Sequence, residues 1–262
     1  LDGDRLSLTG TDLEVELVGR VQLTSAGESG EVTVPARKLV DICKSLPEGS
    51  DIQFSMQDSK VTVKSGRSRF TLSTLSAREF PNVEDSMGTH QFTLKQGELK
   101  RLIERTGFAM AQQDVRYYLN GMLWELNDKQ LRVVATDGHR LAMCTLPHKV
   151  GVEGDTQVIL PRKGVLELSR LLLDEEAEIA IVIGSNHIRA TTNDFTFTSK
   201  LVDGKFPDYQ RVLPRSPDKM VLGSRLELRQ AFTRTAILSN EKYRGVRLKL
   251  TENNLDIVAN NP

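Results

Sequence analysis

The stretch Leu-Arg-Val-Val-Ala-Thr-Asp at residues 131–137 decides the fold, because similar stretches stand at two other places in the chain. Leu-Ser-Leu-Thr-Gly-Thr-Asp occupies residues 6–12, and Leu-Asp-Ile-Val-Ala-Asn occupies residues 255–260. The three stretches begin 125 and 124 residues apart. A period this long is that of a whole domain, since solenoid repeats span only about 20 to 50 residues. The pattern therefore predicts an array of similar domains.

Other landmarks keep nearly the same spacing. Pro35 and Pro161 each open a helical pattern and are 126 residues apart, as are Phe80 and Phe206, each followed by proline. We therefore expect three repeats, at residues 1–89, 90–212 and 213–262.

The first and third repeats are expected to be truncated when they are measured against the second. About 34 residues would be missing before the first repeat and about 71 after the third. On this interpretation the chain is an interior fragment of a longer protein.

The second repeat shows the full set of elements. Helices are expected at residues 97–109 and from Pro161 to about Leu173. Short alternating runs separated by turn residues predict strands, at residues 91–94, 119–125, 131–135, 140–146, 156–160, 178–183, 187–191 and 195–201. Two helices and seven or eight mostly antiparallel strands make each repeat an α+β domain.

Composition is that of a soluble globular protein. The chain has 262 residues, of which 39% are hydrophobic and 27% are charged, and no apolar run approaches the ~18 residues of a membrane span. Cys43 and Cys144 are too few for a disulfide framework, so a reducing cytoplasm is expected. Cys43 lies on the apolar stripe of a helical pattern and is expected in a core.

Basic charge is concentrated in the four helical segments. Residues 36–46, 98–108, 162–173 and 225–235 together have a net charge of +7, so the remainder has −7 in a chain whose formal total is zero. Solvated helix faces often favour Lys and Arg, which is the simplest explanation for any one helix. The same sign on all four predicts a surface that faces a polyanion. Phe232 stands between Arg229 and Arg234 but lies on a predicted apolar stripe with Leu228 and Ala231. No aromatic residue is therefore interleaved on the basic faces, and contact with phosphates rather than bases is expected.

Four motifs resemble those of one known family. They are Arg-Tyr-Tyr-Leu-Asn-Gly at 116–121, Thr-Asp-Gly-His-Arg-Leu at 136–141, Gly-Lys-Phe-Pro-Asp-Tyr at 204–209 and Arg-Gly-Val-Arg-Leu at 244–248. Over essentially its whole length the chain is similar to the bacterial sliding clamps, the β subunits of DNA polymerase III. The resemblance implies repeated DNA-clamp domains, with three like domains in each subunit. It also implies a head-to-tail homodimer closed into a ring, with helices lining the hole and sheets on the rim.

The implied function is that of a processivity factor that encircles duplex DNA without sequence specificity. Implied partners are double-stranded DNA, the catalytic subunit of DNA polymerase III, the clamp loader, and other repair and replication proteins with clamp-binding motifs. The family is not enzymatic, and no cofactor or metal is implied. This agrees with the absence of a phosphate-binding glycine loop and with four widely separated histidines.

A groove between the second and third domains receives partner peptides in this family. The resemblance places its wall at Leu119, Thr136, Gly138, His139, Arg140, Leu141, Pro207, Arg211, Val212 and Tyr243. Tyr243 stands where the family often has Phe. An apolar cleft with a few donors suits a linear motif with aliphatic and aromatic anchors. Taken without the resemblance, residues 136–140 are simply a hairpin turn.

The basic helix residues and the resemblance together give a set of DNA-facing residues. They are Arg37, Lys38, Lys44, Lys100, Arg101, Gln113, Tyr117, Tyr118, Arg162, Lys163, Arg170, Arg229 and Arg234. The alternative for Tyr117 or Tyr118 is packing on a sheet, since alternation buries one of two neighbours. The ring-closing interface is implied at Lys38, Phe70 and Leu72 on one side and at Ile237 and Leu238 on the other.

Two other classes of protein remain as alternatives. A catalytic or carbohydrate-active β protein would need paired carboxylates or a metal site, and the sequence offers neither. A nucleic-acid-binding β-repeat protein that does not form a ring would have the same basic helices. Retention on DNA distinguishes the two, because a ring slides off the free ends of linear duplex but stays on a circle, whereas a protein that binds in a groove is retained equally on both.

Overall fold

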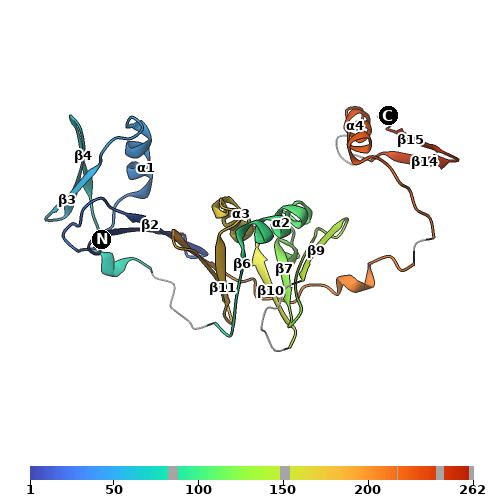
Figure 1. Ribbon diagram of the computed structural model, residues 1–262, viewed down its shortest axis with the longest axis horizontal. Helices are drawn as coiled ribbons and strands as arrows, with labels where there is room; N and C mark the ends of the chain where they lie inside the picture. The colour runs from blue at the N-terminus through green and yellow to red at the C-terminus, as the bar shows by residue number, and fades with distance from the viewer. Residues whose placement is uncertain (82–87, 148–153, 217, 240–244, 260–262) are drawn as a thin grey trace. The chain divides into compact units, whose positions relative to one another are not determined.

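The structure is a computed structural model that describes residues 1–81, 88–147, 154–216, 218–239 and 245–259 (Figure 1). The chain divides into two units, Leu1–Pro207 and Asp208–Pro262. The first unit contains the first repeat and the second repeat as far as Pro207. In the part of the chain that the structure describes, no helix is long and apolar enough to cross a membrane.

One sheet of the second repeat has four antiparallel strands in the order β10-β7-β8-β9. They are β7 (Gly121–Leu126), β8 (Gln130–Thr136), β9 (Leu141–Pro147) and β10 (Thr156–Pro161). Residues 131–136 of the repeated stretch therefore lie in β8, and Asp137 begins the turn that joins β8 to β9.

The other sheet has six strands and crosses the boundary between repeats. Its order is β1-β2-β13-β12-β11-β6. The strands are β1 (Arg5–Thr11), β2 (Val15–Gln22), β6 (His90–Lys95), β11 (Glu178–Ile183), β12 (His187–Thr191) and β13 (Phe195–Lys200). β2 pairs with β13 in antiparallel register, with Leu17 opposite Phe197. The β1–β2 hairpin of the first repeat thus extends the sheet of the second.

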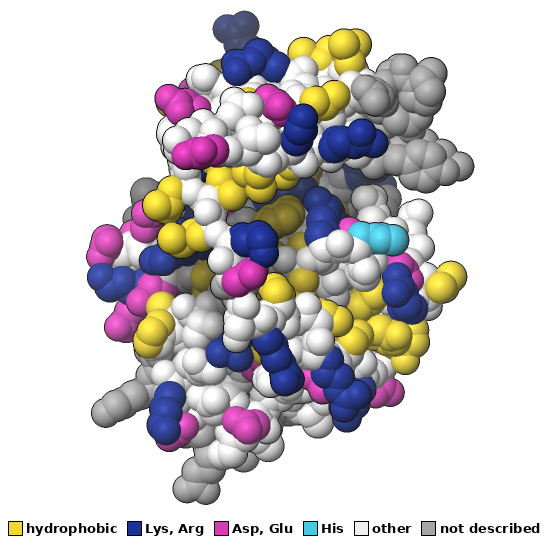
Figure 2. Space-filling view, turned by 90° about the vertical axis from the view of Figure 1, so that its right-hand side faces the viewer, with side chains coloured by type: hydrophobic (Ala, Val, Ile, Leu, Met, Phe, Trp, Pro, Cys, Tyr) yellow, Lys and Arg dark blue, Asp and Glu magenta, His cyan; other side chains and the backbone are white. Residues whose placement is uncertain are grey.

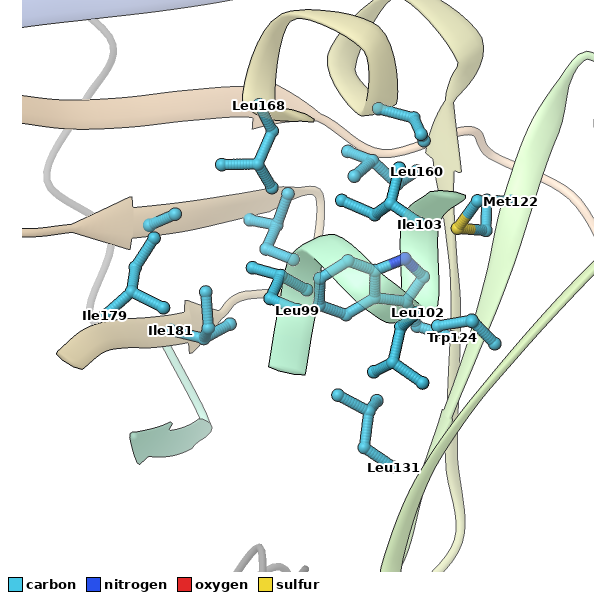
Figure 3. Packing of buried hydrophobic residues seen from close by; sticks show 14 of the residues in the cluster. Leu99, Leu102, Ile103, Met122, Trp124, Leu131, Leu160, Leu168, Ile179 and Ile181 are labelled. Carbon is cyan, nitrogen blue, oxygen red and sulfur yellow. The ribbon is translucent and has the colours of Figure 1, made fainter. Parts of the chain in front are cut away.

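Two helices cover the core of the second repeat. α2 (Gln96–Thr106) packs on β6, β8 and β9, and α3 (Arg162–Leu171) packs on β7, β10 and β13. The helices lie side by side (Figure 1). Leu99 and Leu168 are fully buried from the two helices and lie in one cluster with Trp124 (Figure 3). Each helix places its apolar stripe inward, so its charged residues face away from the core.

The first repeat has a smaller core. α1 (Ala36–Ser45) lies on the three-stranded sheet of β3 (Gln53–Gln57), β4 (Lys60–Ser65) and β5 (Ser68–Ser73). Its buried residues are Ile42, Val61, Val63 and Leu72. Cys43, which was expected in a core, is exposed. Leu39, Ile42 and Leu46 make the contact with this cluster, and the stripe is too narrow to include Cys43.

The second unit has one helix and one hairpin among its described residues. α4 (Arg225–Ala236) contacts β15 (Asn254–Val258), which pairs with β14 (Arg247–Thr251). Leu228 and Ala231 are half-buried and form an apolar stripe on α4. Phe232, on the same stripe, remains 36% exposed.

Equivalent elements return at the predicted spacing. The β1–β2 hairpin matches β8–β9, α1 matches α3, and β3–β5 match β11–β13. In the third repeat, α4 matches α2, and β14 and β15 match β7 and β8. The prediction of a repeated α+β domain is confirmed. The helix expected at 97–109 ends at Thr106 and continues as a separate 3₁₀ turn, Gly107–Ala109.

Candidate nucleic-acid and peptide interface

The turn between β8 and β9 is held by its own side chains. Thr136 Oγ1 donates to the Arg140 carbonyl over 2.7 Å and accepts from the Gly138 N–H over 3.1 Å. Asp137 Oδ1 accepts from the N–H groups of His139 and Arg140 over 2.9 and 3.0 Å. Gly138 has φ +87°, a left-handed conformation in which glycine has no steric penalty. Thr and Asp are therefore needed to fix the turn, whatever else the turn contacts.

The first repeat contains the same turn. Thr11 Oγ1 donates to the Val15 carbonyl and accepts from the Leu13 N–H, and Asp12 Oδ1 accepts from the N–H groups of Glu14 and Val15. Leu13, which stands where the second repeat has Gly138, also has a positive φ, of 74°. The recurring Thr-Asp pair is thus explained by the geometry of the turn.

Arg140 fixes the turn to the end of α2. Its Nε donates to Asp137 Oδ2 over 3.1 Å, and its Nη2 donates to the Phe108 carbonyl over 2.7 Å. Its guanidinium also lies over the Phe108 ring, 5.5 Å from the centroid. Burial would raise the pKa of Asp137, but the N–H groups of His139 and Arg140 and the Arg140 side chain outweigh it, so the pKa is lowered.

Arg116 and Asp114 form a second charged pair beside the turn. Arg116 Nε and Nη2 donate to the two carboxylate oxygens of Asp114 over 3.0 and 2.8 Å, in the forked geometry that suits Arg. The side-chain hydrogen bond from Arg116, followed by the bond from its backbone N–H, lowers the pKa of Asp114 to about 2. The loop therefore holds a carboxylate that stays ionised at physiological pH.

These residues surround a polar cleft of about 340 Å³ in the second repeat. It is lined by Phe108, Met110, Ala111, Gln112, Asp114, Asp137, His139, Arg140 and Arg162. Arg162, predicted to face DNA from α3, is half-buried here, and its Nη1 donates to the Met110 carbonyl over 3.4 Å. With Asp114 and Asp137 each paired to an arginine, Arg162 adds positive charge to the cleft.

Of the predicted groove residues in the first unit, the structure places residues 136–141 in one turn, described above. Leu119 is only 2% exposed, so its side chain offers little surface to a ligand. Pro207 is exposed at the end of the first unit. Arg211 and Val212 belong to the second unit and are exposed, and Tyr243 lies outside the described residues.

The predicted DNA-contacting loop lies next to this turn. Gln113 is exposed and has φ +57°. Tyr117 and Tyr118 lie in a 3₁₀ helix, Tyr117–Leu119, so the strand expected from residue 119 begins at Gly121. Their rings meet edge to face at 5.7 Å, with Tyr117 57% exposed and Tyr118 half-buried. The side chain of Tyr117 is accessible to a ligand.

The basic helix residues mostly point into solvent. Exposed members are Arg37, Lys38, Lys44, Arg101, Lys163, Arg170, Arg229 and Arg234, while Lys100 and Arg162 are half-buried. Lys163 is paired with Asp12 of the first repeat, and Arg170 is paired with Glu167. On the face shown in Figure 2, Lys and Arg side chains stand among acidic and apolar ones.

The residues of the implied ring-closing interface differ in exposure. Leu72 is buried beneath α1 and Phe70 packs against the same cluster, both from the edge strand β5. Ile237 and Leu238 follow α4 and are 76% and 68% exposed. The two pairs lie in different units, and Lys38 is exposed on α1.

Sequence reasoning missed Asp114, Arg116 and Phe108 as members of this interface. Arg116 begins the motif at 116–121, which was the available signal. Its partner Asp137 is 21 residues away, and only the folded chain brings them together.

Three family models match the chain in order. The N-terminal domain of the DNA polymerase III β subunit matches residues 1–84, the central domain residues 93–208, and the C-terminal domain residues 210–262. Together they extend over nearly the whole chain.

Curated relatives and solved structures agree with these matches. The β sliding clamp of Pseudomonas aeruginosa is 64% identical over 262 residues, which is 100% of this chain and 71% of that protein. That of Escherichia coli is 58% identical over 257 residues, with 98% and 70% covered. A P. aeruginosa clamp structure has a TM-score of 0.95, covering 100% of this chain and 72% of that one. The Bartonella birtlesii clamp, solved with griselimycin, is 38% identical with a TM-score of 0.93, covering 100% and 71%.

Proposed function

The chain belongs to the DNA polymerase III β subunit family, the β sliding clamps, and from this premise we propose how it holds DNA and its partners. Its function is that of a sliding clamp in DNA replication. We propose that it encircles duplex DNA without reading sequence and confers processivity by topology, in the cytoplasm and without catalysing a reaction. The single observation that supports DNA contact best is the outward basic face of the helices, because their apolar faces are committed to the cores.

DNA contact is proposed to be electrostatic. The exposed cations on α1, α2 and α3 are Lys and Arg side chains that can reach phosphates, and no aromatic residue is interleaved with them. Such contacts do not depend on base identity, which a sliding protein requires. Gln113 and Tyr117 would add contacts at the adjacent loop.

Partner proteins are proposed to dock on the turn at residues 136–141. The turn is rigid, exposes His139 and Arg140, and stands beside half-buried Leu141. Proposed partners are the catalytic subunit of DNA polymerase III, the clamp loader and other proteins with clamp-binding motifs. A P. aeruginosa clamp 64% identical to this chain was solved with griselimycin, and we propose that this compound also binds here.

Ring closure is proposed to use sheet extension between two copies. Within the first unit, β13 pairs with β2 of the preceding repeat. β5 is the equivalent of β13, and it is an edge strand of its sheet. An edge strand offers unpaired backbone groups to another chain. A homodimer in which β5 accepts a strand from a second copy would therefore repeat a junction already present inside the chain.

The test of DNA contact is the salt dependence of binding to a linear duplex. Replacing Arg37, Lys44 and Arg101 with Ala should reduce the slope of log affinity against log salt by about 3, since each lost phosphate contact removes about 1. The matched control replaces Lys60, Lys64 and Lys129, which are exposed and lie outside the helices. Equal slopes for the two triple variants would contradict the proposal.

A further inference from the structure

The DNA-contacting loop and the peptide-binding turn are joined through one side chain. Arg116 lies between Gln113 and Tyr117 in the sequence, and its Nη2 donates to the Asp137 carbonyl of the turn over 3.3 Å. A Cβ built on Gly138 would lie 3.0 Å from both Nη1 and Nη2 of Arg116. The tip of the turn therefore rests directly on the guanidinium.

The position of this guanidinium is fixed from the loop side. Asp114 accepts from the backbone N–H, Nε and Nη2 of Arg116 over 2.8, 3.0 and 2.8 Å. Asp114 is itself fixed to Asn120, which accepts from the Asp114 N–H over 2.9 Å and donates to its carbonyl over 2.8 Å. A movement of the loop must therefore move Arg116, and with it the surface beneath Gly138.

Arg116 can also take part in ligand binding without giving up these contacts. Its side chain is 46% exposed. In the described part of the chain, the recorded hydrogen bonds use Nε and Nη2, which leaves the Nη1 donors for a phosphate. Arg162 lines the same cleft and adds a second positive charge. A nucleic-acid phosphate at the loop would thus bind the same guanidinium on which the turn rests.

We propose that Arg116 is a positioning residue that couples nucleic-acid contact at residues 113–118 to ligand binding at the turn 136–141. Because Arg116 is held rigidly between the two surfaces, a ligand that selects one position of the loop also selects one position of the turn, and the second ligand then finds that position already populated. The coupling is reciprocal, because each ligand must change the affinity of the other by the same factor. The inference rests on the proposed function, since it takes both surfaces as binding sites.

The test measures the affinity of griselimycin for the full chain, with and without a saturating short duplex that has a single-stranded overhang. The wild-type chain should bind griselimycin about fivefold more tightly with DNA present, the lower end of typical couplings. Arg116→Lys keeps the charge but loses the forked geometry, so the ratio of the two affinities should fall to about 1. Arg132→Lys, an equivalent change on β8, should leave the ratio unchanged.

The outcomes separate this inference from the function on which it rests. If both griselimycin and DNA bind the wild-type chain but DNA does not change the griselimycin affinity, the coupling is overturned and the proposed function stands. The coupling through Arg116 is also overturned if DNA still raises the griselimycin affinity of the Arg116→Lys variant about fivefold. Failure of either ligand to bind the folded wild-type chain overturns both. A merely structural role for Arg116 would lower both affinities and leave their ratio unchanged. As a second readout, DNA alone should shift the NMR signal of the Gly138 N–H in the wild-type chain, and much less in Arg116→Lys.

Discussion

At the scale of single residues, the interface is organised by carboxylates that accept several hydrogen bonds at once. Asp137 accepts from two backbone N–H groups and from Arg140, and Asp114 accepts three bonds from Arg116. Each ionised carboxylate holds a short loop in one conformation. The exposed arginines beside them are therefore preorganised for ligands rather than freely mobile.

Asp114 should titrate far below its usual pKa of 3.8, at about 2, because the Arg116 side chain and N–H stabilise the ionised form. Because the Asp114 pKa is lower in the folded protein, its pairing with Arg116 stabilises the fold fully above the unfolded pKa of 3.8. That stabilisation is lost as the pH falls through about 2. A carboxyl NMR titration measures it directly. In the Arg116→Ala variant the Asp114 pKa should return towards its usual value, and no change would refute the pairing.

Gly138→Ala should weaken griselimycin binding and destabilise the protein by about 1 kcal/mol, a typical cost of a left-handed conformation for a non-glycine residue. The new methyl group would also displace Arg116, whose nitrogens lie 3.0 Å from its position. Chemical denaturation and a binding titration measure the two effects. Gly154→Ala is the matched control: it too has a positive φ, but nothing lies within 4 Å of its Cβ position. It should lose similar stability and keep griselimycin affinity.

At the scale of elements, α2 and α3 divide their residues sharply between core and solvent. Leu172 is 1% exposed and its neighbour Leu173 is 83% exposed, although both follow α3 and are chemically identical. The difference arises because only Leu172 packs in the main cluster of the second repeat.

Leu172→Ala should therefore destabilise the protein by about 2–5 kcal/mol, the usual range for a buried Leu. Leu173→Ala should change stability by less than about 0.5 kcal/mol, as surface substitutions do. Urea unfolding of both variants makes the comparison. Similar losses for the two would show that the end of α3 is packed differently.

Sequence reasoning was sufficient for elements with a local signal. The strands at 178–183 and 187–191 have the predicted bounds, because alternation and turn residues define them. Three features could not be read locally. The pairing of β2 with β13 joins residues far apart in sequence. Tyr117–Leu119 form a 3₁₀ turn because the chain closes through the hydrogen bonds between Asp114 and Asn120. Cys43 is exposed because the first-repeat core is narrow.

For the candidate site, the sequence supplied the turn but not its supports. Thr136, Asp137 and Gly138 follow from turn chemistry. Their contacts with Arg116 and Phe108 link segments that only the tertiary fold brings together. The Gln113 and Tyr117 assignments remain predictions from the family resemblance.

At the scale of the whole molecule, the proposed ring would be built from repeated units. The first two repeats share a hairpin, a helix and a three-stranded element, the described part of the third has a helix and a hairpin, and a continuous sheet joins the first repeat to the second. Closing the proposed ring would then need only further strand pairings like that of β2 with β13, made between two copies of the chain. The protein would hold DNA by enclosure, with the helix cations supplying weak, sequence-independent contacts.

The most direct measurement of enclosure is retention of the protein on one plasmid before and after a single cut. After a clamp loader has placed the protein on a nicked circular plasmid, it should stay on the plasmid during a high-salt wash. It should then dissociate once a restriction enzyme linearises the DNA, because a ring slides off free ends. Equal retention on circle and linear DNA, or loss from the circle with the steep salt dependence of a groove binder, would contradict the account.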